Sequence, residues 1–169
     1  MCRSVNGSAE ATTLPAESID LVVAGQAFHW FDPPKARSEF VRVLRPGGFV
    51  ALVWNTRKTD ATPFLRGYEQ LLRTYGTDYK EVVHTNVDAA TLTAFFGPGG
   101  HKRFTLPNEQ RFDLDGVIGR TRSSSFVPVE GHPNYEPLFA GLRRLFAVEA
   151  VDGLVSFEYE TELFVGRMG

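Results

Sequence analysis

A short segment of aromatic and polar residues, 25–31, follows the first long apolar run of the chain. Within it His29 could act as a general base or orient a substrate carboxylate, because imidazole changes charge near neutral pH. Alternatively, His29 could be a packed loop histidine without a chemical role. Trp30 and the two phenylalanines of the segment could form an apolar wall around a reacting group, or they could seal the end of a sheet. Gln26 could hydrogen-bond a ligand or face solvent.

Other chemically active side chains are scattered along the sequence. Cys2 is the single cysteine, and His84, His101 and His132 lack the spacing of metal ligands, so we expect no metal site. The serines at 123–125 have no flanking elbow glycines and no obvious base, which disfavours a serine nucleophile. Candidate chemistry therefore centres on residues 25–31.

The elements around this segment form a βαβ pattern. The nearly continuous apolar runs 19–24 and 49–54 are typical of strands covered on both faces of a parallel sheet. Asp32 and Pro33 suit the start of the intervening helix, and residues 46–48, Pro-Gly-Gly, are expected to end it. Ligands of such units bind beyond the carboxyl ends of the strands, so residues 25–31 are predicted to lie at the ligand-binding edge.

Four pieces of sequence, in order and correctly spaced, resemble the class I S-adenosylmethionine-dependent methyltransferases. The pieces are residues 7–10 (GSAE), residues 19–22 (IDLV), residues 25–31 (GQAFHWF) and residues 39–48 (EFVRVLRPGG). The combination of AFHWFD with RVLRPGG is similar to the subgroup that includes trans-aconitate methyltransferase. The resemblance implies an α/β fold with an incomplete Rossmann-like sheet, flanking helices and an antiparallel C-terminal strand.

The resemblance also implies a cofactor and an arrangement of site residues. Ser8, Ala9 and Glu10 would meet the adenine ring of S-adenosylmethionine, and Gln26, Ala27 and Phe28 would lie along its methionine part. His29, as a tentative catalytic residue, and Trp30 would face a small-molecule acceptor such as a carboxylate. A base is optional for an acceptor that is already charged, since alignment with the activated methyl group then supplies most of the catalysis.

Asp32-Pro33-Pro34 also has some similarity to the acceptor-binding motif of amino-group methyltransferases, but Lys35 stands where that motif has an aromatic residue. A helix N-cap explains the same residues more simply.

The glycine-rich cofactor loop that precedes these pieces in the family has no counterpart among the eighteen residues before Ile19. The hypothesis that follows is an N-terminally truncated domain, and the alternative to an enzyme is a non-catalytic remnant acting as an interaction module or a truncated gene product. Without its usual neighbour, the strand at 19–24 would be an unpaired apolar edge. We therefore expect self-association through that edge.

The rest of the chain is expected to complete a single domain, 1–169, around the βαβ core at 17–55. A helical insertion at 62–97 is predicted from Thr62-Pro63 and an apolar stripe after it, with a further helix over 88–96. Strands and helices are predicted at 101–166, including helices after Asp113 and over 133–148. The final strand alternates, so we expect the odd-numbered residues 155–165 on its buried face.

Charge and composition exclude several function classes. The formal net charge is -2 and no dense basic run occurs, so we expect neither a nucleic-acid partner nor a membrane-surface partner. The apolar runs are far shorter than a membrane span, and the first ten residues lack a signal-peptide core. The sequence favours a cytoplasmic protein with a small-molecule ligand.

Overall fold

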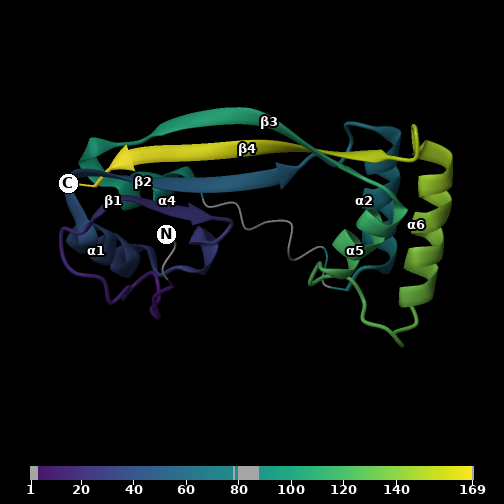
Figure 1. Ribbon diagram of the computed structural model, residues 1–169, viewed down its shortest axis with the longest axis horizontal. Helices are drawn as coiled ribbons and strands as arrows, with labels where there is room; N and C mark the ends of the chain where they lie inside the picture. Colours follow the sequence, from purple (N-terminus) through teal and green to yellow (C-terminus); the bar gives the residue numbers. More distant parts are fainter. Residues whose placement is uncertain (1–3, 78, 80–87, 169) are drawn as a thin grey trace. The chain divides into compact units, whose positions relative to one another are not determined.

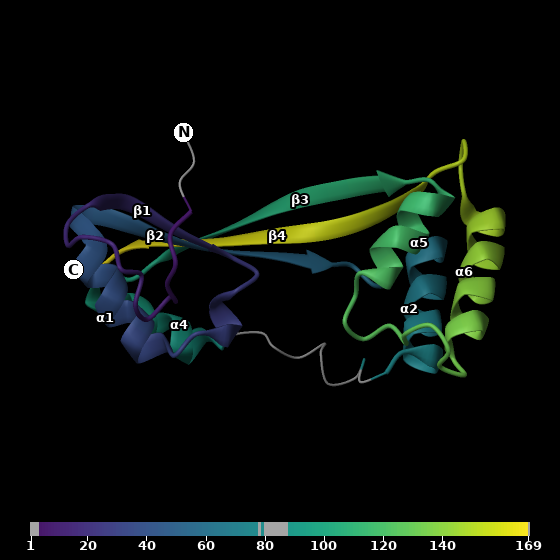
Figure 2. The same ribbon diagram turned by 60° about the horizontal axis from the view of Figure 1, so that its bottom comes forward.

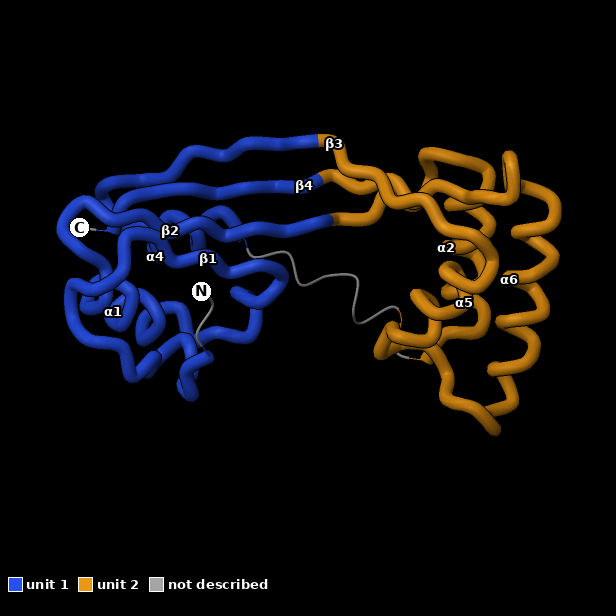
Figure 3. Tube along the Cα trace, in the orientation of Figure 1, with its two compact units in different colours: residues 1–55, 86–106, 161–169 blue, residues 56–85, 107–160 orange. Residues whose placement is uncertain are grey.

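The computed structural model describes residues 4–77, 79 and 88–168, and it divides into two compact units (Figures 1 and 3). Unit 1 takes its described residues from 1–55, 86–106 and 161–169, and unit 2 takes its own from 56–85 and 107–160. Strands β2 (Leu44–Arg57), β3 (Lys102–Phe112) and β4 (Val155–Arg167) contribute residues to both units. That residues 1–169 behave as a single domain stays a prediction.

The sheet has the strand order β1-β2-β4-β3, with β1 (Ile19–Gly25) at one edge. Strand β1 runs parallel to β2, and Ala24 pairs with Leu52. Strand β4 runs antiparallel to β2, because Thr161 bonds to Asn55 while the earlier residue Glu158 bonds to the later residue Lys58. The mixed α/β fold with an antiparallel C-terminal strand is confirmed.

Two helices of unit 1, α1 (Pro33–Val43) and α4 (Ala89–Phe96), cover one face of its strands (Figure 2). Each begins at an aspartate cap: Asp32 accepts a hydrogen bond from the Lys35 N–H, and Asp88 accepts one from the Thr91 N–H. The short 3₁₀ helices η1 (Phe28–Trp30) and η2 (Gly97–Gly99) complete the unit. Its core is made of buried apolar side chains from these helices and from the strands: Ala24, Phe28, Ala36, Phe40, Leu44, Val50, Leu52, Leu92, Phe95, Phe96 and Met168.

Strand β2 begins earlier than the sequence predicts. The helix ends at Val43 as the Pro-Gly-Gly signal requires, but residues 44–48 already belong to β2. The pairing shifts from Ile19 opposite Leu44 to Leu21 opposite Phe49, so the extra residues form an irregular bulge. A turn signal ends a helix locally, whereas strand pairing from β1 decides how far the next strand extends.

Unit 2 contains the helices α2 (Pro63–Tyr75), α5 (Leu114–Arg122) and α6 (Tyr135–Glu149). Thr62 and Asp113 cap α2 and α5 by accepting backbone hydrogen bonds three residues later, as the sequence predicts. These helices bury the end of β4 that belongs to the unit, whereas β3 contributes only the partly buried Phe112. The fully packed side chains are Phe64, Leu65, Tyr68, Leu72, Tyr79, Val117, Val127, Leu138, Phe139, Leu142, Val155, Phe157 and Tyr159. Part of the predicted insertion 62–97, residues 78 and 80–87, lies outside the described residues.

Helices α2 and α6 pack closely through a reciprocal pair of glycines. A Cβ added at Gly67 would lie 2.5 Å from a methyl carbon of Leu145, and one at Gly141 would lie 2.5 Å from a methyl carbon of Leu71. The residue order of these two contacts makes the helices antiparallel. An alanine at either position would require the facing leucine side chain to shift.

The two units bury different residues of β4. In unit 2 the odd-numbered residues Val155, Phe157 and Tyr159 are buried, as predicted from the alternation. In unit 1 the even-numbered Phe164 packs against the core, and Val165 is only partly buried. The prediction of one buried face along the whole strand is therefore wrong beyond residue 160, because the core of each unit selects its own side chains.

Candidate functional site

A tight turn holds the first predicted cofactor-binding residues. Ser8 and Ala11 exchange two backbone hydrogen bonds, and Ala9 packs against the core of unit 1. The carboxylate of Glu10 accepts a hydrogen bond from the backbone N–H of Asp32 at 3.0 Å. That bond and others to the carboxylate hold the pKa of Glu10 below its usual range. The carboxylate of Glu10 is thus engaged with the start of α1.

Gln26 marks the carboxyl end of β1. Its backbone lies in the left-handed region, with φ at 53°, and its backbone N–H donates to the carbonyl of Val53 at 2.9 Å. Its side-chain amide donates to the carbonyl of Asn55 at 3.0 Å. Few residue types other than glycine, asparagine and aspartate adopt this backbone conformation readily. The strain fixes the direction in which residues 27–31 leave the strand, at the edge where ligands of this fold bind.

The aromatic residues of the next turn differ sharply in exposure. Phe28 is buried and meets Phe95 edge-on, with ring centroids 4.6 Å apart. Trp30 has 80% of its surface exposed, and its ring lies beside that of His29 with centroids 4.8 Å apart. Phe28 therefore seals the end of the sheet, whereas Trp30 is free to contact a ligand.

Two buried nitrogen atoms around Phe28 have no hydrogen-bond partner among the described residues. They are Nδ1 of His29 and the indole Nε1 of Trp54, whose ring meets Phe28 edge-on at 6.2 Å. A buried polar group without a partner costs free energy, so such groups often face a ligand or water. The sequence predicts His29 but not Trp54. The only sequence signal for Trp54 is an indole N–H at the end of the apolar run 49–54.

The structure brings the two predicted cofactor segments together. The Glu10–Asp32 bond places the turn at residues 8–11 against the residue that follows the loop at 25–31. Gln26, Ala27 and Phe28 follow β1 directly, and His29 and Trp30 continue the same turn. The roles of these residues remain predictions.

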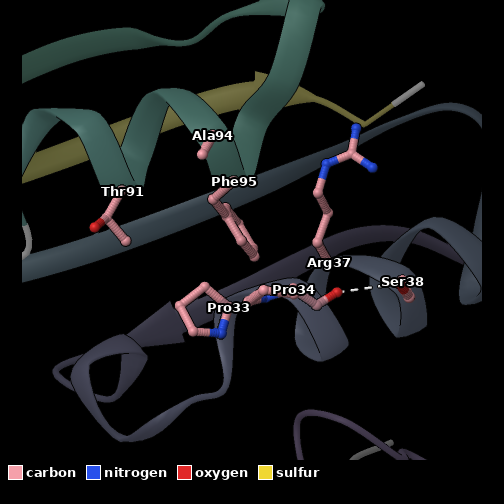
Figure 4. A pocket seen from close by; sticks show the side chains of 7 residues that line it. All are labelled: Pro33, Pro34, Arg37, Ser38, Thr91, Ala94 and Phe95. Atoms are coloured by element: carbon pink, nitrogen blue, oxygen red, sulfur yellow. Dashed lines mark hydrogen bonds between the residues drawn. The ribbon is translucent and has the colours of Figure 1, made fainter.

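A separate groove of about 490 Å³ lies between α1 and α4 (Figure 4). Figure 4 shows Phe95 extending between the two helices, and Arg37 is the only charged residue in the lining. The lining consists of Pro33, Pro34, Arg37, Ser38, Thr91, Ala94 and Phe95. None of the predicted site residues lines this groove, so it is distinct from the candidate site.

Within the part of the chain that the structure describes, no three His, Cys, Asp or Glu side chains are grouped as metal ligands would be. Cys2 and His84 lie outside that part. Among the described helices, none has both the length and the apolar composition needed to cross a lipid bilayer.

Sequence comparison identifies proteins that are similar to parts of this chain. Residues 2–52 match the methyltransferase domain family. A methyltransferase-like protein of Schizosaccharomyces pombe is 46% identical over 77 residues, which cover 46% of this chain and 29% of that protein. The malonyl-[acyl-carrier protein] O-methyltransferase of Methylococcus capsulatus is 50% identical over 48 residues, which cover 28% of this chain and 18% of that protein.

The N-terminal part of this chain is thus similar to methyltransferases. Among solved structures, a protein from Anaeromyxobacter dehalogenans described as a type II methyltransferase matches 96% of this chain and 70% of its own, with a TM-score of 0.63 and 22% identity. That likeness supports the fold. The matched segments span less than a third of the length of the curated relatives. Membership of the methyltransferase subgroup similar to trans-aconitate methyltransferase stays a prediction.

Proposed function

We propose that this protein transfers a methyl group from S-adenosylmethionine to a small-molecule acceptor. The observation that carries the proposal is the 3.0 Å hydrogen bond from the Asp32 N–H to Glu10, which fastens the first segment expected to hold the cofactor to the residue that follows the loop at 25–31. The match of residues 2–52 to the methyltransferase domain supports the same assignment, since it includes both segments.

In this proposal the turn at residues 8–10 binds the adenine ring, with Ala9 providing an apolar contact. Gln26, Ala27 and Phe28 bind the methionine part, where the strained backbone of Gln26 directs the turn. When bound, the cofactor supplies a methyl group already activated by a sulfonium. These proposed cofactor contacts do not involve the glycine-rich loop that is typical of the family.

His29 and Trp30 face the acceptor in the proposed site. The unpartnered Nδ1 of His29 is suited to hydrogen-bond and orient an acceptor oxygen, and the exposed ring of Trp30 is suited to exclude water from it. The indole N–H of Trp54 is a further donor for the ligand. Because alignment is the main requirement of methyl transfer to a charged oxygen, these residues act chiefly by positioning the acceptor.

We further propose that the acceptor oxygen belongs to a carboxylate. The relative from Methylococcus capsulatus is a malonyl-[acyl-carrier protein] O-methyltransferase, which supports an oxygen acceptor of this kind. A carboxylate is already ionised at neutral pH and needs no general base.

Calorimetric titration with S-adenosylhomocysteine tests the cofactor assignment. We expect saturable binding in the micromolar range. The variant Gln26→Asn keeps a residue type that tolerates the left-handed backbone while shortening the side chain, and should weaken binding roughly 2- to 10-fold. Gln70→Asn on α2, an exposed glutamine of unit 2, is the matched control and should leave the affinity unchanged.

Absence of heat at high ligand concentration would contradict the proposal for this chain and would favour a non-catalytic scaffold. Equal weakening by the two glutamine variants would show that the binding site is not at Gln26.

A further inference from the structure

Unit 2 contains a cluster of arginines with fewer carboxylates than guanidinium groups. Arg57 Nη2 donates to Glu69 Oε2 at 2.7 Å, and Arg73 Nε donates to Glu69 Oε1 at 2.9 Å. A third arginine, Arg120, has no carboxylate partner among the described residues of unit 2. The cluster therefore has three positive charges against the one negative charge of Glu69.

Arg57 is largely buried. Its side chain is only 13% exposed, and its Nη1 atom is buried without any hydrogen-bond partner among the described residues. Leaving donors of a buried charged group unpaired is costly. The free edge of this guanidinium is thus suited to an acceptor from outside the chain.

Arg120 is held in place by aromatic residues rather than by a carboxylate. Its Nε donates to the Tyr159 hydroxyl at 3.0 Å and its Nη1 to the Tyr68 hydroxyl at 3.5 Å. Its guanidinium lies over the ring of Phe157, 4.4 Å from the centroid. These contacts fix the orientation of the guanidinium and leave its charge uncompensated.

The guanidinium groups of Arg57 and Arg120 both contact the side chain of Tyr68. Arg57 stacks over the ring of Tyr68, 5.1 Å from its centroid, while Arg120 reaches the hydroxyl of that ring. Tyr68 is itself buried, and its hydroxyl bonds to Thr121 Oγ1, which donates to the carbonyl of Val117. The ring between the two cations is therefore rigidly held.

We propose that Arg57 and Arg120 form an anion-binding site in unit 2 that takes a small molecule through a carboxylate or phosphate group. Both groups present oxygens to the planar donor fork of arginine, and their charge compensates the excess positive charge of the cluster. The site rests on unit 2 alone and does not depend on the proposed cofactor site of unit 1.

A second arginine of α5 also stacks on an aromatic ring, and its substitution is the control for Arg120. Arg122 lies over the ring of Phe139 at 5.4 Å and is exposed. Its substitution removes the same charge from α5 without touching the Tyr68 contacts. A site-specific effect must therefore distinguish Arg120 from Arg122.

The test follows the arginine Nε–H signals of the ¹⁵N-labelled protein by nuclear magnetic resonance during titration with glutarate and, separately, with inorganic phosphate. Salt at about 0.15 M suppresses non-specific attraction. We expect the Arg120 signal to shift saturably with one of the two anions, which identifies the group that binds. Arg120→Gln should weaken that binding about tenfold or more, and Arg122→Gln less than about twofold. The uncharged analogue glutaramide should cause no shift.

Three results would overturn the proposal: no saturable shift with either anion, equal weakening by the two arginine variants, or binding of glutaramide as tight as that of glutarate. If Arg120→Gln does not fold, Tyr159→Phe removes the acceptor that orients Arg120 while keeping its charge, and it should weaken binding as well. Retained affinity in that folded variant would likewise exclude the site. Titration with S-adenosylhomocysteine reports separately on unit 1.

Discussion

The carboxylate of Glu39 on α1 accepts two hydrogen bonds from Thr12, one from its backbone N–H at 2.8 Å and one from its hydroxyl at 2.6 Å. Arg42 donates to the same carboxylate one helical turn later, at 2.7 Å and 2.8 Å. Thr12, which follows the turn at residues 8–11, is therefore fastened to α1 through the Glu39 side chain. The hydrogen bonds from Arg42 and then those from Thr12 lower the pKa of Glu39 to about 2.

The lowered pKa of Glu39 predicts that the protein loses stability in acid. The unfolded chain has a pKa of 4.5 for Glu39, so the stabilisation is complete above that pH and is lost as the pH falls from 4.5 to about 2. Glu39→Gln should be less stable at pH 7 by about 1–3 kcal/mol and should show a smaller decrease toward pH 3. Urea unfolding at several pH values measures both effects. An unchanged pH dependence in this variant would show that other groups control acid unfolding.

The reciprocal glycines of α2 and α6 predict an unusual effect of alanine. The double variant Gly67→Ala with Gly141→Ala should destabilise the protein, because steric costs of about 1–3 kcal/mol per site exceed the gain in helix propensity of about 1 kcal/mol. Gly119→Ala on α5 has open space around it and should stabilise by about 0.5–1 kcal/mol. Thermal unfolding compares the variants. A double variant that is as stable as Gly119→Ala would mean that the leucines rotate away freely.

The edge strand β1 predicts self-association, which we propose occurs between two copies of this chain. Leu21 and Val23 are 51% and 59% exposed on that edge strand. An antiparallel pairing centred on Val22 places Leu21 opposite Val23 of the second copy and avoids facing like charges. Val23→Lys should lower the dimer fraction in light scattering over a range of concentrations. Val148→Lys, which changes a still more exposed valine on α6, is the control, and identical masses for both variants would refute the edge contact.

The exposure of Trp30 predicts an optical signal for ligand binding at the candidate site. Acrylamide should quench this indole readily, and saturating S-adenosylhomocysteine should reduce the quenching if residues 25–31 contact the ligand. Trp30→Phe should reduce the ligand-dependent change, because the less exposed Trp54 is then the remaining indole. Unaltered quenching of the unsubstituted protein at saturation would place the ligand elsewhere.

Features that depend on a few neighbouring residues could be predicted from the sequence. Asp32, Thr62 and Asp113 each cap the helix that the sequence assigns to them, since the capping bond spans only three residues. The parallel pairing of β1 and β2 followed from two apolar runs joined by one helix. The position of the candidate loop beyond β1 followed from the same unit.

Features that depend on distant residues could not be predicted. The buried face of β4 changes at about residue 160, because the packing partners of Tyr159 and Phe164 come from different units. The contact between Arg57 and Glu69 and that between Arg120 and Tyr159 join separate elements, and no local pattern signals them. The unpartnered Trp54 nitrogen is likewise a consequence of tertiary packing.

The spacing within the α2–α6 contact has a consequence for folding at high concentration. Gly67 precedes Leu71 by four residues, and Gly141 precedes Leu145 by the same interval, so both helices present one shared interlocking surface. Such a surface is self-complementary, since Leu71 of one molecule would fit Gly67 of an antiparallel α2 from another. Refolding from a concentrated solution should therefore yield misassembled dimers in which α2 packs against α2 of a second molecule instead of against its own α6.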